Sequence, residues 1–596
     1  MNNSTEMMAA FGGGMSFQEK RRVIGKANDK MEQMEGLDKN RPVFGIDLGT
    51  TNSAISVITT GDNPETIRLT NSKLTMPSCV MWKNGEFIVG EEAYKHREMA
   101  NVIYSVKRYM QNPNKTVTFK DGSKTLTMRP AEVSAKILEG LIEQTGGVYG
   151  EIKDVVITVP AYFDQNGRNA TREAAEIAGL NLIDIINEPT AAALCYDVKQ
   201  EENGATDFIT FDFGGGTFDV TLARITGGEQ DSDINDIYGI DDTSSKGKII
   251  QCLAIEGDSH LGGDDVDRDL LGIVSNKLIL IAGVSVDDFT REYKESLILR
   301  LENFKKMGTE TNYQLSIDTV TTSGKKVQCD VSIEPKDFLA SLMPSYKKCK
   351  KITDRLLKRA ENNAKTIILV GGSTKNPLLV QMLEEDYPDF NITNAVNQDL
   401  AVTLGAAIKG KIDKFGSDNV TIFDILPISI GIDDDDTMNV MLKAGTVLPA
   451  TASHNFTNVI DNQERMRLRV IQGSSKFANE CVCLGELLFD NLPKAEEGKL
   501  KLCVSITVNA NSEMVCTGNV NGETKELKLS LTGETTGKMV TDKDEKLKRR
   551  WAKFAETLSG EKREQFESLV RGYPDYTSRK DISQFIAANS AALKEK

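Results

Sequence analysis

One strand-and-turn motif occurs twice, and this repeat limits the possible folds more than any other feature. Residues 44–51 read FGIDLGTT and residues 210–217 read TFDFGGGT. In both copies an apolar run leads to an aspartate and then to glycines, which let the backbone approach an anion and offer it N–H groups. A single glycine turn would indicate only a hairpin. Two copies with matching aspartate and threonine positions predict two loops that clamp a polyphosphate between them.

The two aspartates of the repeat, Asp47 and Asp212, are candidate holders of a magnesium ion, largely through its own water molecules, because Mg²⁺ dehydrates reluctantly. No GxxxxGK[ST] run and no GxGxxG run occurs in the sequence. The P-loop and the dinucleotide-binding mode are therefore excluded. A third glycine element, residues 369–374 with the sequence LVGGST, ends another apolar run and would let a flat ligand lie against the backbone.

Length and composition place the chain among large soluble proteins. With 596 residues it should fold into two to four domains. Its formal net charge of -15 argues against nucleic acid as a partner, because a phosphate backbone needs a basic surface. Nine scattered cysteines indicate a reducing compartment and predict neither a disulfide framework nor a zinc site. The first forty residues contain no long apolar run, so we expect no signal peptide, no membrane span and a cytoplasmic location.

Changes in the pattern of apolar and polar residues along the chain predict how it divides into units. After a polar, methionine-rich start, short β-branched runs alternate with helical stretches, then strands of period two follow, and the chain ends in helix. Met466 and Leu468, for example, alternate with arginines. The predicted units are an N-terminal extension (1–40), an α/β domain (41–410) with a surface insertion at 227–247, a linker (411–424) whose apolar segment 420–423 should dock, an antiparallel sandwich (425–537) and a short helical segment (538–596).

Three further motifs complete a pattern that resembles one family. Residues 159–163 read VPAYF, residues 187–193 read NEPTAAA and residues 260–263 read HLGG. With the glycine elements, and in order and spacing from about residue 43 to 531, they resemble the heat-shock protein 70, or DnaK-type, chaperones. The resemblance implies an α/β actin-like ATPase domain of two lobes with ribonuclease H-like halves, then an antiparallel β-sandwich peptide-binding domain and a short α-helical lid-like segment.

The resemblance also assigns roles to residues. Lys107 would position the attacking water and offset charge on the transferring phosphoryl group, and Glu188 would order the water shell of the metal. The implied catalytic residues are Lys107, Asp47, Asp212, Glu188 and Thr217. The implied nucleotide-binding residues are Gly49, Thr50, Thr51, Asn52, Gly214, Gly215, Gly216, Thr217, Gly262, Gly263, Asp264, Glu302, Lys305, Lys306, Thr309, Gly371, Gly372, Ser373, Lys375 and Asp399.

The chain departs from the family pattern at the adenosine pocket. Relatives carry arginine and isoleucine after the Gly-Gly-Ser-Thr turn, where this chain has Lys375 and Asn376, and Lys306 replaces another arginine. Lysine cannot copy the stacking of a planar guanidinium on a base. We expect weaker adenine affinity and intact phosphate chemistry. The helical end is also shorter than the usual lid and ends in residues 594–596 (KEK), without an acidic tail.

The remaining implied residues bind peptide or couple the domains. Asp433 to Asp436 occupy the loop where relatives have an apolar arch, which leads us to expect a bias toward peptides flanked by Lys or Arg. The peptide-binding residues implied are Ile430, Ile432, Phe456, Val459, Met466 and Leu468, whose alternative interpretation is sandwich core. The coupling residues implied are Pro160, Arg168 and Asp424.

The expected function is an ATP-dependent chaperone, an ATPase that binds short apolar segments of unfolded proteins during protein folding and the stress response. Its cofactors would be ATP/ADP and Mg²⁺, with K⁺ as a further candidate. Its partners would be unfolded clients, a J-domain co-chaperone and a nucleotide-exchange factor, and it would be a monomer. Three alternatives remain: a non-hydrolysing ATP-binding holdase or exchange-factor-like module, a metabolite kinase, and an actin-like filament scaffold. Intact Asp47, Lys107, Glu188 and Asp212 count against the first, and the sandwich counts against the second.

Overall fold

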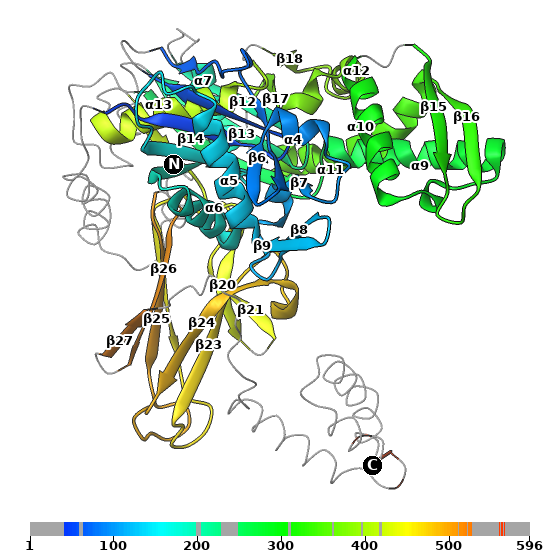
Figure 1. The fold of residues 1–596 in the computed structure, drawn as a ribbon. Coiled ribbons are helices and arrows are strands. Elements are labelled where there is room, and N and C mark those ends of the chain that lie inside the picture. Colours follow the sequence, from blue (N-terminus) through cyan, green and yellow to red (C-terminus); the bar gives the residue numbers. More distant parts are fainter. Residues whose placement is uncertain are drawn as a thin grey trace.

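The computed structural model describes most of the chain. The described residues are 41–58, 63–197, 204–227, 248–307, 311–359, 363–394, 397–416, 420–434, 436–510, 512–520, 523–526, 560, 562, 563 and 566. The predicted N-terminal extension, nearly all of the predicted surface insertion and almost all of the helical segment therefore lie outside the described residues. Figure 1 shows an α/β unit with a smaller β unit below it.

The first half of the α/β unit, lobe I, is built on a mixed sheet in the order β11-β10-β1-β2-β3, with β4 also paired to β2. Its buried apolar residues pack against two helices. The sheet and these helices comprise β1 (Phe44–Leu48), β2 (Asn52–Val57), β3 (Glu65–Thr66), β4 (Met76–Pro77), β10 (Asp154–Val159), β11 (Asn181–Asn187), α5 (Pro130–Glu143) and α6 (Gln165–Ile177).

A smaller subdomain is attached to lobe I. It contains a three-stranded sheet in the order β6-β5-β7 and a hairpin of β8 and β9. Its elements are β5 (Cys79–Lys83), β6 (Glu86–Val89), α4 (Glu91–Lys95), β7 (Val102–Tyr104), the short 3₁₀ helix η2 (Val106–Tyr109), β8 (Val117–Asp121) and β9 (Lys124–Met128).

Lobe II repeats the strand plan of lobe I. Its sheet has the order β18-β17-β12-β13-β14-β19, where β19 (Val420–Phe423) comes from the connection to the β unit. Strand β12 pairs antiparallel with β13 and parallel with β17, as β1 pairs with β2 and β10. The lobe comprises β12 (Gly204–Phe213), β13 (Phe218–Gly227), β14 (Lys248–Asp258), α9 (Gly263–Ala282), η3 (Val286–Asp288), α10 (Arg291–Met307), β15 (Tyr313–Val320), β16 (Lys326–Ile333), α11 (Pro335–Arg359), β17 (Thr366–Val370), η4 (Gly372–Lys375), α12 (Pro377–Asp386) and β18 (Asn391–Thr393).

Two helices join the lobes, α7 (Glu188–Asp197) and α13 (Ala401–Phe415). Their apolar residues form one core with strands of both sheets. The helices touch so closely that a Cβ on Gly405 would lie 1.7 Å from the backbone oxygen of Ala191. The repeated sheets are therefore held back to back on a shared helical layer, and the turns that follow β1 and β12 open on the same side.

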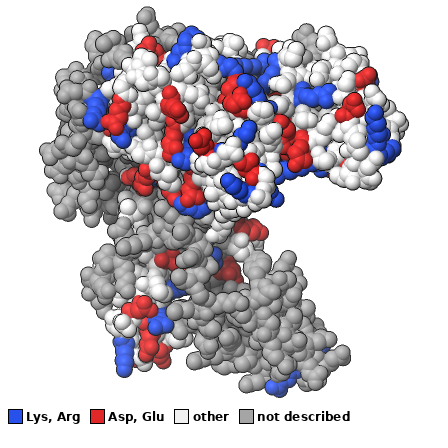
Figure 2. Space-filling model, in the orientation of Figure 1, with Lys and Arg blue, Asp and Glu red and all other residues white. Residues whose placement is uncertain are grey.

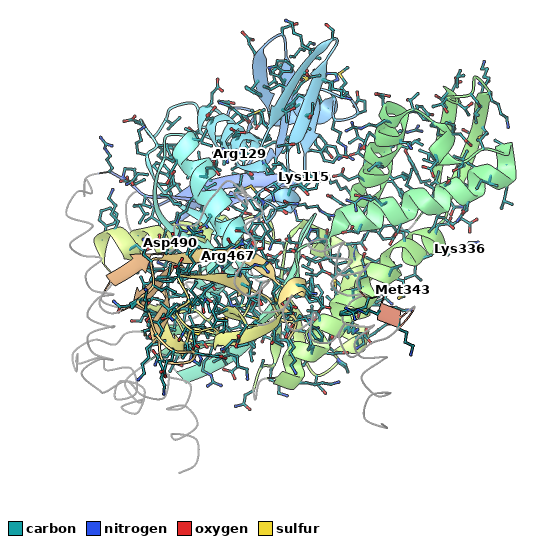
Figure 3. All side chains as sticks on the ribbon, turned by 90° about the horizontal axis from the view of Figure 1, so that it is seen from below. Lys115, Arg129, Lys336, Met343, Arg467 and Asp490 are labelled. Atoms are coloured by element: carbon teal, nitrogen blue, oxygen red, sulfur yellow. The ribbon has the colours of Figure 1, made fainter. Side chains whose placement is uncertain are left out.

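The β unit contains two four-stranded antiparallel sheets, β21-β20-β23-β24 and β22-β25-β26-β27, with one apolar core. Its elements are β20 (Ile430–Asp434), β21 (Thr437–Leu442), β22 (Ala450–Phe456), β23 (Arg465–Gln472), η5 (Ala478–Glu480), β24 (Val482–Asp490), β25 (Leu502–Val508), β26 (Met514–Val520) and β27 (Glu523–Glu526). In Figure 3, Arg467 and Asp490 mark this unit as seen from below, and Lys336 and Met343 mark α11 of lobe II. The mixed α/β architecture with several sheets agrees with the predicted fold class.

The connection between the units differs from the predicted linker at its start. Helix α13 runs past Gly410 to Phe415, because Lys414 is buried and its ammonium donates to the Arg41 carbonyl and to Asp154. The apolar segment forms β19 (Val420–Phe423), which pairs in parallel with β14. The chain thus enters the β unit only after it has added a sixth strand to the sheet of lobe II.

Charges of both signs are mixed on the surface. On the face seen in Figure 2, Asp and Glu alternate with Lys and Arg over the α/β unit. In the part of the chain that the structure describes, no helix combines the length and apolar character needed to cross a membrane.

Candidate functional site

A cleft of about 480 Å³ lies between the lobes, where the two repeated turns face each other. The glycines of the second turn pack directly against the threonines of the first. A Cβ added to Gly215 would lie 1.8 Å from Thr51 Oγ1, and a Cβ added to Gly216 would lie 2.5 Å from Thr50 Cγ2. The wall behind is equally tight, since a Cβ on Gly262 would lie 2.4 Å from Gly215. Glycine is therefore a steric requirement at these turns, and their backbone forms the wall of the cleft.

Nearly all of the nucleotide residues that the sequence suggests come together at this cleft. Gly216 and Gly262 are the exceptions among those described, since they pack behind its wall, and Thr309 lies outside the described residues. The cleft is lined by Asp47, Gly49, Thr50, Thr51, Asn52, Lys107, Glu188, Asp212, Gly214, Gly215, Thr217, Gly263, Asp264, Glu302, Lys305, Lys306, Gly371, Gly372, Ser373, Lys375 and Asp399.

Acidic side chains converge at the closed end of the cleft, beside one lysine. Lys107 Nζ donates to Glu188 Oε1 at 2.5 Å, and both side chains are buried. Thr158 Oγ1 donates to Asp47 Oδ1 at 3.1 Å. Burial, and then the charge of Glu188, raises the pKa of Asp47 to about 7 and the pKa of Asp212 well above its usual value. This concentration of carboxylates favours a bound cation, because a cation would offset the repulsion.

The donor set at this end fits Mg²⁺ with a polyphosphate. The oxygen ligands it offers are the ones that Mg²⁺ prefers, and too few of them converge to replace its whole water shell. Thr51 Oγ1 is enclosed in the cleft wall and has no hydrogen-bond partner, although a buried hydroxyl without one is costly. Phosphate oxygens entering between the turns would supply that partner. Gly371 has a φ of +83°, and a Cβ there would lie 2.5 Å from Asp212 Oδ1, so this turn is also shaped around the carboxylate.

The open end of the cleft is lined by ion pairs. Lys306 Nζ donates to Glu302 Oε1 at 2.6 Å, and Lys305 Nζ donates to Asp267 Oδ2 at 2.7 Å and to the Gly263 carbonyl at 2.9 Å. Burial opposes the charge of Glu302, but the cations around it, led by Arg97 and Lys306, lower its pKa to about 2. Lys375 pairs with Asp399 on the opposite wall. Carboxylates and ammonium groups thus alternate where a sugar and a base would lie.

A set of contacts closes lobe I onto lobe II above the cleft, and its main residue, Arg97, could not be predicted from any motif. Arg97, which follows α4, forms a buried ion pair with Glu302 on α10. The Arg97 guanidinium carbon lies 5.1 Å from the centroid of the Tyr94 ring and 5.2 Å from that of Tyr104. Tyr104 also donates to Glu295 at 2.5 Å. No motif surrounds Arg97, so only the fold reveals its role.

Two other residues of the site were not predicted, although each lies close in sequence to a residue that was. Arg108 Nη2 lies 2.9 Å from Asp265 Oδ2 and donates to the Gly215 carbonyl at 3.3 Å, so it ties the glycine turn after β12 of lobe II to lobe I. Asp219 is buried, and burial followed by the charge of Glu188 raises its pKa to about 8. Arg108 follows Lys107 directly and Asp219 lies two residues after Thr217, which was a usable signal in both cases.

Two of the three predicted coupling residues, Arg168 and Asp424, bind the same Asn187 side chain. Asp424 accepts hydrogen bonds from Asn187 Nδ2 at 2.6 Å and from Thr190 Oγ1 at 3.2 Å, and Arg168 donates to the same Asn187 side chain. Burial raises the pKa of Asp424 and lowers the pKa of Arg168 to about 10. Pro160 is buried directly after β10, eight residues before Arg168 in the sequence.

The α/β and β units also touch directly. The backbone N–H of Gln165 donates to Gln472 Oε1 at 2.9 Å, and Arg172 Nη2 lies 3.0 Å from Glu513 Oε1. Both contacts start from α6, and Figure 1 shows the upper ends of the β strands below this helix. The cleft between the lobes and the β unit are therefore linked through β10, α6 and the turn into α7.

The six predicted peptide residues do not share one environment. Ile430, Ile432, Met466 and Leu468 are buried in the core between the two sheets, because alternate residues of β20 and β23 point inward. The sandwich-core interpretation thus describes their position. Phe456 and Val459 are only partly buried, and Phe456 packs against the same core. Asp433 and Asp434, predicted to lie in a loop, instead end strand β20, where they pair with Met438 and Thr437 of β21. Asp433 Oδ2 lies 3.0 Å from Arg469 Nη1, and Asp434 is exposed.

The comparisons with known proteins all indicate the same protein family. The family model described as "Hsp70 protein" matches residues 43–586. The chain is 31% identical to the "Chaperone protein dnaK" of Cyanidium caldarium, over 91% of this chain and 88% of that protein. It is 31% identical to the "Chaperone protein DnaK" of Prochlorococcus marinus, over 93% and 89%. A third relative of the same name, from Mycoplasmopsis synoviae, is 30% identical over 89% and 85%.

Proposed function

Because this chain belongs to the Hsp70 protein family, we propose that it is an ATP-dependent molecular chaperone with an actin-like ATPase unit of two ribonuclease H-like lobes. Its β-sandwich binds short apolar segments of unfolded proteins, and ATP binding and hydrolysis control its affinity for them. The observation that supports this most is the linkage of the two units, in which Asp424 contacts Asn187 at the base of the nucleotide cleft. A cleft for a polyphosphate alone would not need that connection.

The cleft residues divide the work of hydrolysis. ATP with Mg²⁺, when bound, supplies the phosphoryl group and the charge that offsets the carboxylates. The glycine turns and Thr50, Thr51 and Thr217 would hold the phosphates, and Asp47 and Asp212 would hold the hydrated metal. Lys107, kept in place by its bond to Glu188, presents a positive charge where negative charge grows during transfer, and it orients the attacking water. Glu302 and Lys305 face the sugar.

Peptide binding is coupled to this site through the connector. When β19 pairs with β14 and Asp424 binds Asn187 and Thr190, the sandwich packs against α6. ATP hydrolysis then releases the sandwich from α6. Coupling of this kind requires only that the nucleotide and the peptide each favour one of two arrangements. Pro160 and Arg168 relay between the cleft and Asp424.

Apolar client segments enter the sandwich at Phe456 and Val459, and the buried Ile430, Ile432, Met466 and Leu468 form the floor behind them. Burial of one leucine side chain stabilises the complex by roughly 1.5 to 3 kcal/mol, which suits reversible capture. Asp434, exposed beside the loop, favours clients flanked by Lys or Arg. J-domain and exchange-factor partners, a monomeric state, a cytoplasmic location and K⁺ as a second ion complete the proposal.

The test is single-turnover ATP hydrolysis, with and without a saturating apolar peptide with basic flanks. We expect the peptide to stimulate hydrolysis in the parent and Lys107→Ala to abolish turnover while it retains nucleotide binding. Lys120→Ala, which removes an exposed lysine of β8, is the matched control and should behave as the parent. Tight ATP binding without turnover in the parent would replace the proposal with the non-hydrolysing holdase or exchange-factor-like module.

A further inference from the structure

The open end of the cleft contains a side chain whose hydrogen-bonding capacity is not used. Asn376 lines the cleft beside Lys375, between η4 and α12. Its Nδ2 is enclosed and has no hydrogen-bond partner. A buried amide donor without an acceptor costs free energy, so a ligand that brings an acceptor to this point gains more than one that does not.

The orientation of this amide is determined by the helix that follows. Asn376 is the N-cap of α12, and its Oδ1 accepts a hydrogen bond from the Leu378 backbone N–H at 3.1 Å. Turning the amide over would leave that N–H unpaired and place the nitrogen against another donor. The oxygen is therefore committed to the cap, and Asn376 offers only a donor to anything bound beside it.

Other polar groups at this end are already engaged. Lys306 is paired with Glu302 and Lys375 with Asp399. Ser373 Oγ donates to the Gly214 carbonyl at 2.8 Å, so its single hydroxyl hydrogen is used. Lysine stems pack against any purine face alike, and they lack the planar guanidinium that stacks on a base. The exposed lysine ammonium groups can each turn a remaining N–H toward any acceptor, so they do not distinguish one base edge from another. The Asn376 donor is held in one orientation, and we take it as the group at this end that does.

The two common purines differ at that edge. Adenine has a 6-amino donor, whereas guanine and hypoxanthine have a 6-oxo acceptor, and all three share the N7 acceptor. A fixed donor at this edge finds an acceptor at both position 6 and N7 of a 6-oxopurine, whereas adenine offers it an acceptor only at N7 and a second donor at position 6. We propose that Asn376 broadens base selection, so that the cleft accepts 6-oxopurine nucleotides at affinities close to those of adenine nucleotides. This inference rests on the proposed nucleotide site.

The test compares ADP, IDP and GDP as competitors of a fluorescent diphosphate nucleotide, with Mg²⁺ and the full chain. IDP differs from adenine nucleotides at position 6 without the 2-amino group of guanine. The quantity measured is the ratio of the IDP and ADP dissociation constants within each protein, which cancels effects on the phosphates. We expect this ratio to be within about tenfold of unity in the parent.

Two variants preserve the cap while changing the donor. Asn376→Asp replaces the donor by an acceptor, and Asn376→Ser withdraws it, and both residues are good N-caps. One hydrogen bond exchanged for a mismatch should move the ratio toward ADP by roughly tenfold in Asn376→Asp and less in Asn376→Ser. Equal thermal midpoints of the three proteins establish that α12 is intact.

The outcomes separate this inference from the function on which it rests. A ratio that shifts toward ADP in both variants supports the assignment. ADP binding with IDP rejected more than a hundredfold, or a ratio that neither variant changes, overturns the assignment and leaves the ATPase proposal standing. Absence of binding of all three nucleotides to the folded parent overturns both.

Discussion

Replacing Arg97 by methionine should speed nucleotide release, because Arg97 ties lobe I to lobe II above the cleft. The arginine and its partner Glu302 are each 5% exposed. Opening the cleft must separate them, and a hydrogen bond to a charged group contributes about 1.5 to 3 kcal/mol. That range corresponds to a rate increase of roughly 10- to 150-fold. Because Lys306 still pairs with Glu302 in the variant, we expect a value near the lower limit, about tenfold.

The assay is stopped-flow displacement of a fluorescent ADP analogue by excess unlabelled nucleotide. Lys95→Met is the matched control, because Lys95 lies in α4 and its pair with Glu92 is exposed on both sides. Surface pairs of this kind contribute little, so its release rate should equal that of the parent. Methionine preserves most of the length of the arginine and the lysine, so both variants differ from the parent mainly by the loss of a positive charge.

The reasoning would be refuted if Arg97→Met released ADP within twofold of the parent rate at an unchanged thermal midpoint. Tyr104→Phe provides a second measurement, since it removes only the hydroxyl that donates to Glu295. It should accelerate release less than Arg97→Met. An effect of Tyr104→Phe larger than that of Arg97→Met would place the closing contact at Glu295 instead.

Three further predictions follow from other contacts. Gly405→Ala forces α13 away from the Ala191 carbonyl and should lower stability by about 1 to 3 kcal/mol in thermal unfolding, whereas Gly272→Ala, which meets nothing within 4 Å, should not. Arg172→Glu should reduce peptide-stimulated ATP hydrolysis by repelling Glu513, and Glu513→Arg in the same chain should restore it; failure of the restoration would exclude this pair as a coupling contact. Burial raises the pKa of Asp164 to about 6, so its ionised form costs stability above pH 6 and this cost fades as the pH falls toward 4. Asp164→Asn, which keeps the cap on α6, should therefore stabilise the protein more at pH 7 than at pH 5 in thermal scans, and a difference independent of pH would contradict this.

Much of the site could be predicted because its chemistry lies in short contiguous segments. A strand, an aspartate and a glycine turn are adjacent in sequence, and the requirement for glycine follows from the turn itself, as Gly215 and Gly371 show. The duplication also predicted that two such turns would face each other. The interior of the sandwich was less certain, because alternation identifies an inward face at Met466 and Leu468 but not whether that face meets core or ligand.

The sequence by itself determined the two glycine turns, the carboxylates beside them and the alternation of the sandwich strands. Only the tertiary structure decided which charges meet. Arg97 and Glu302 are separated by 205 residues, and Gln165 and Gln472 by 307. The unpaired Nδ2 of Asn376 is likewise visible only once the helix cap and the cleft wall are in place. Local motifs follow from the backbone geometry of neighbouring residues, whereas a buried ion pair depends on how distant elements pack, which no short pattern records.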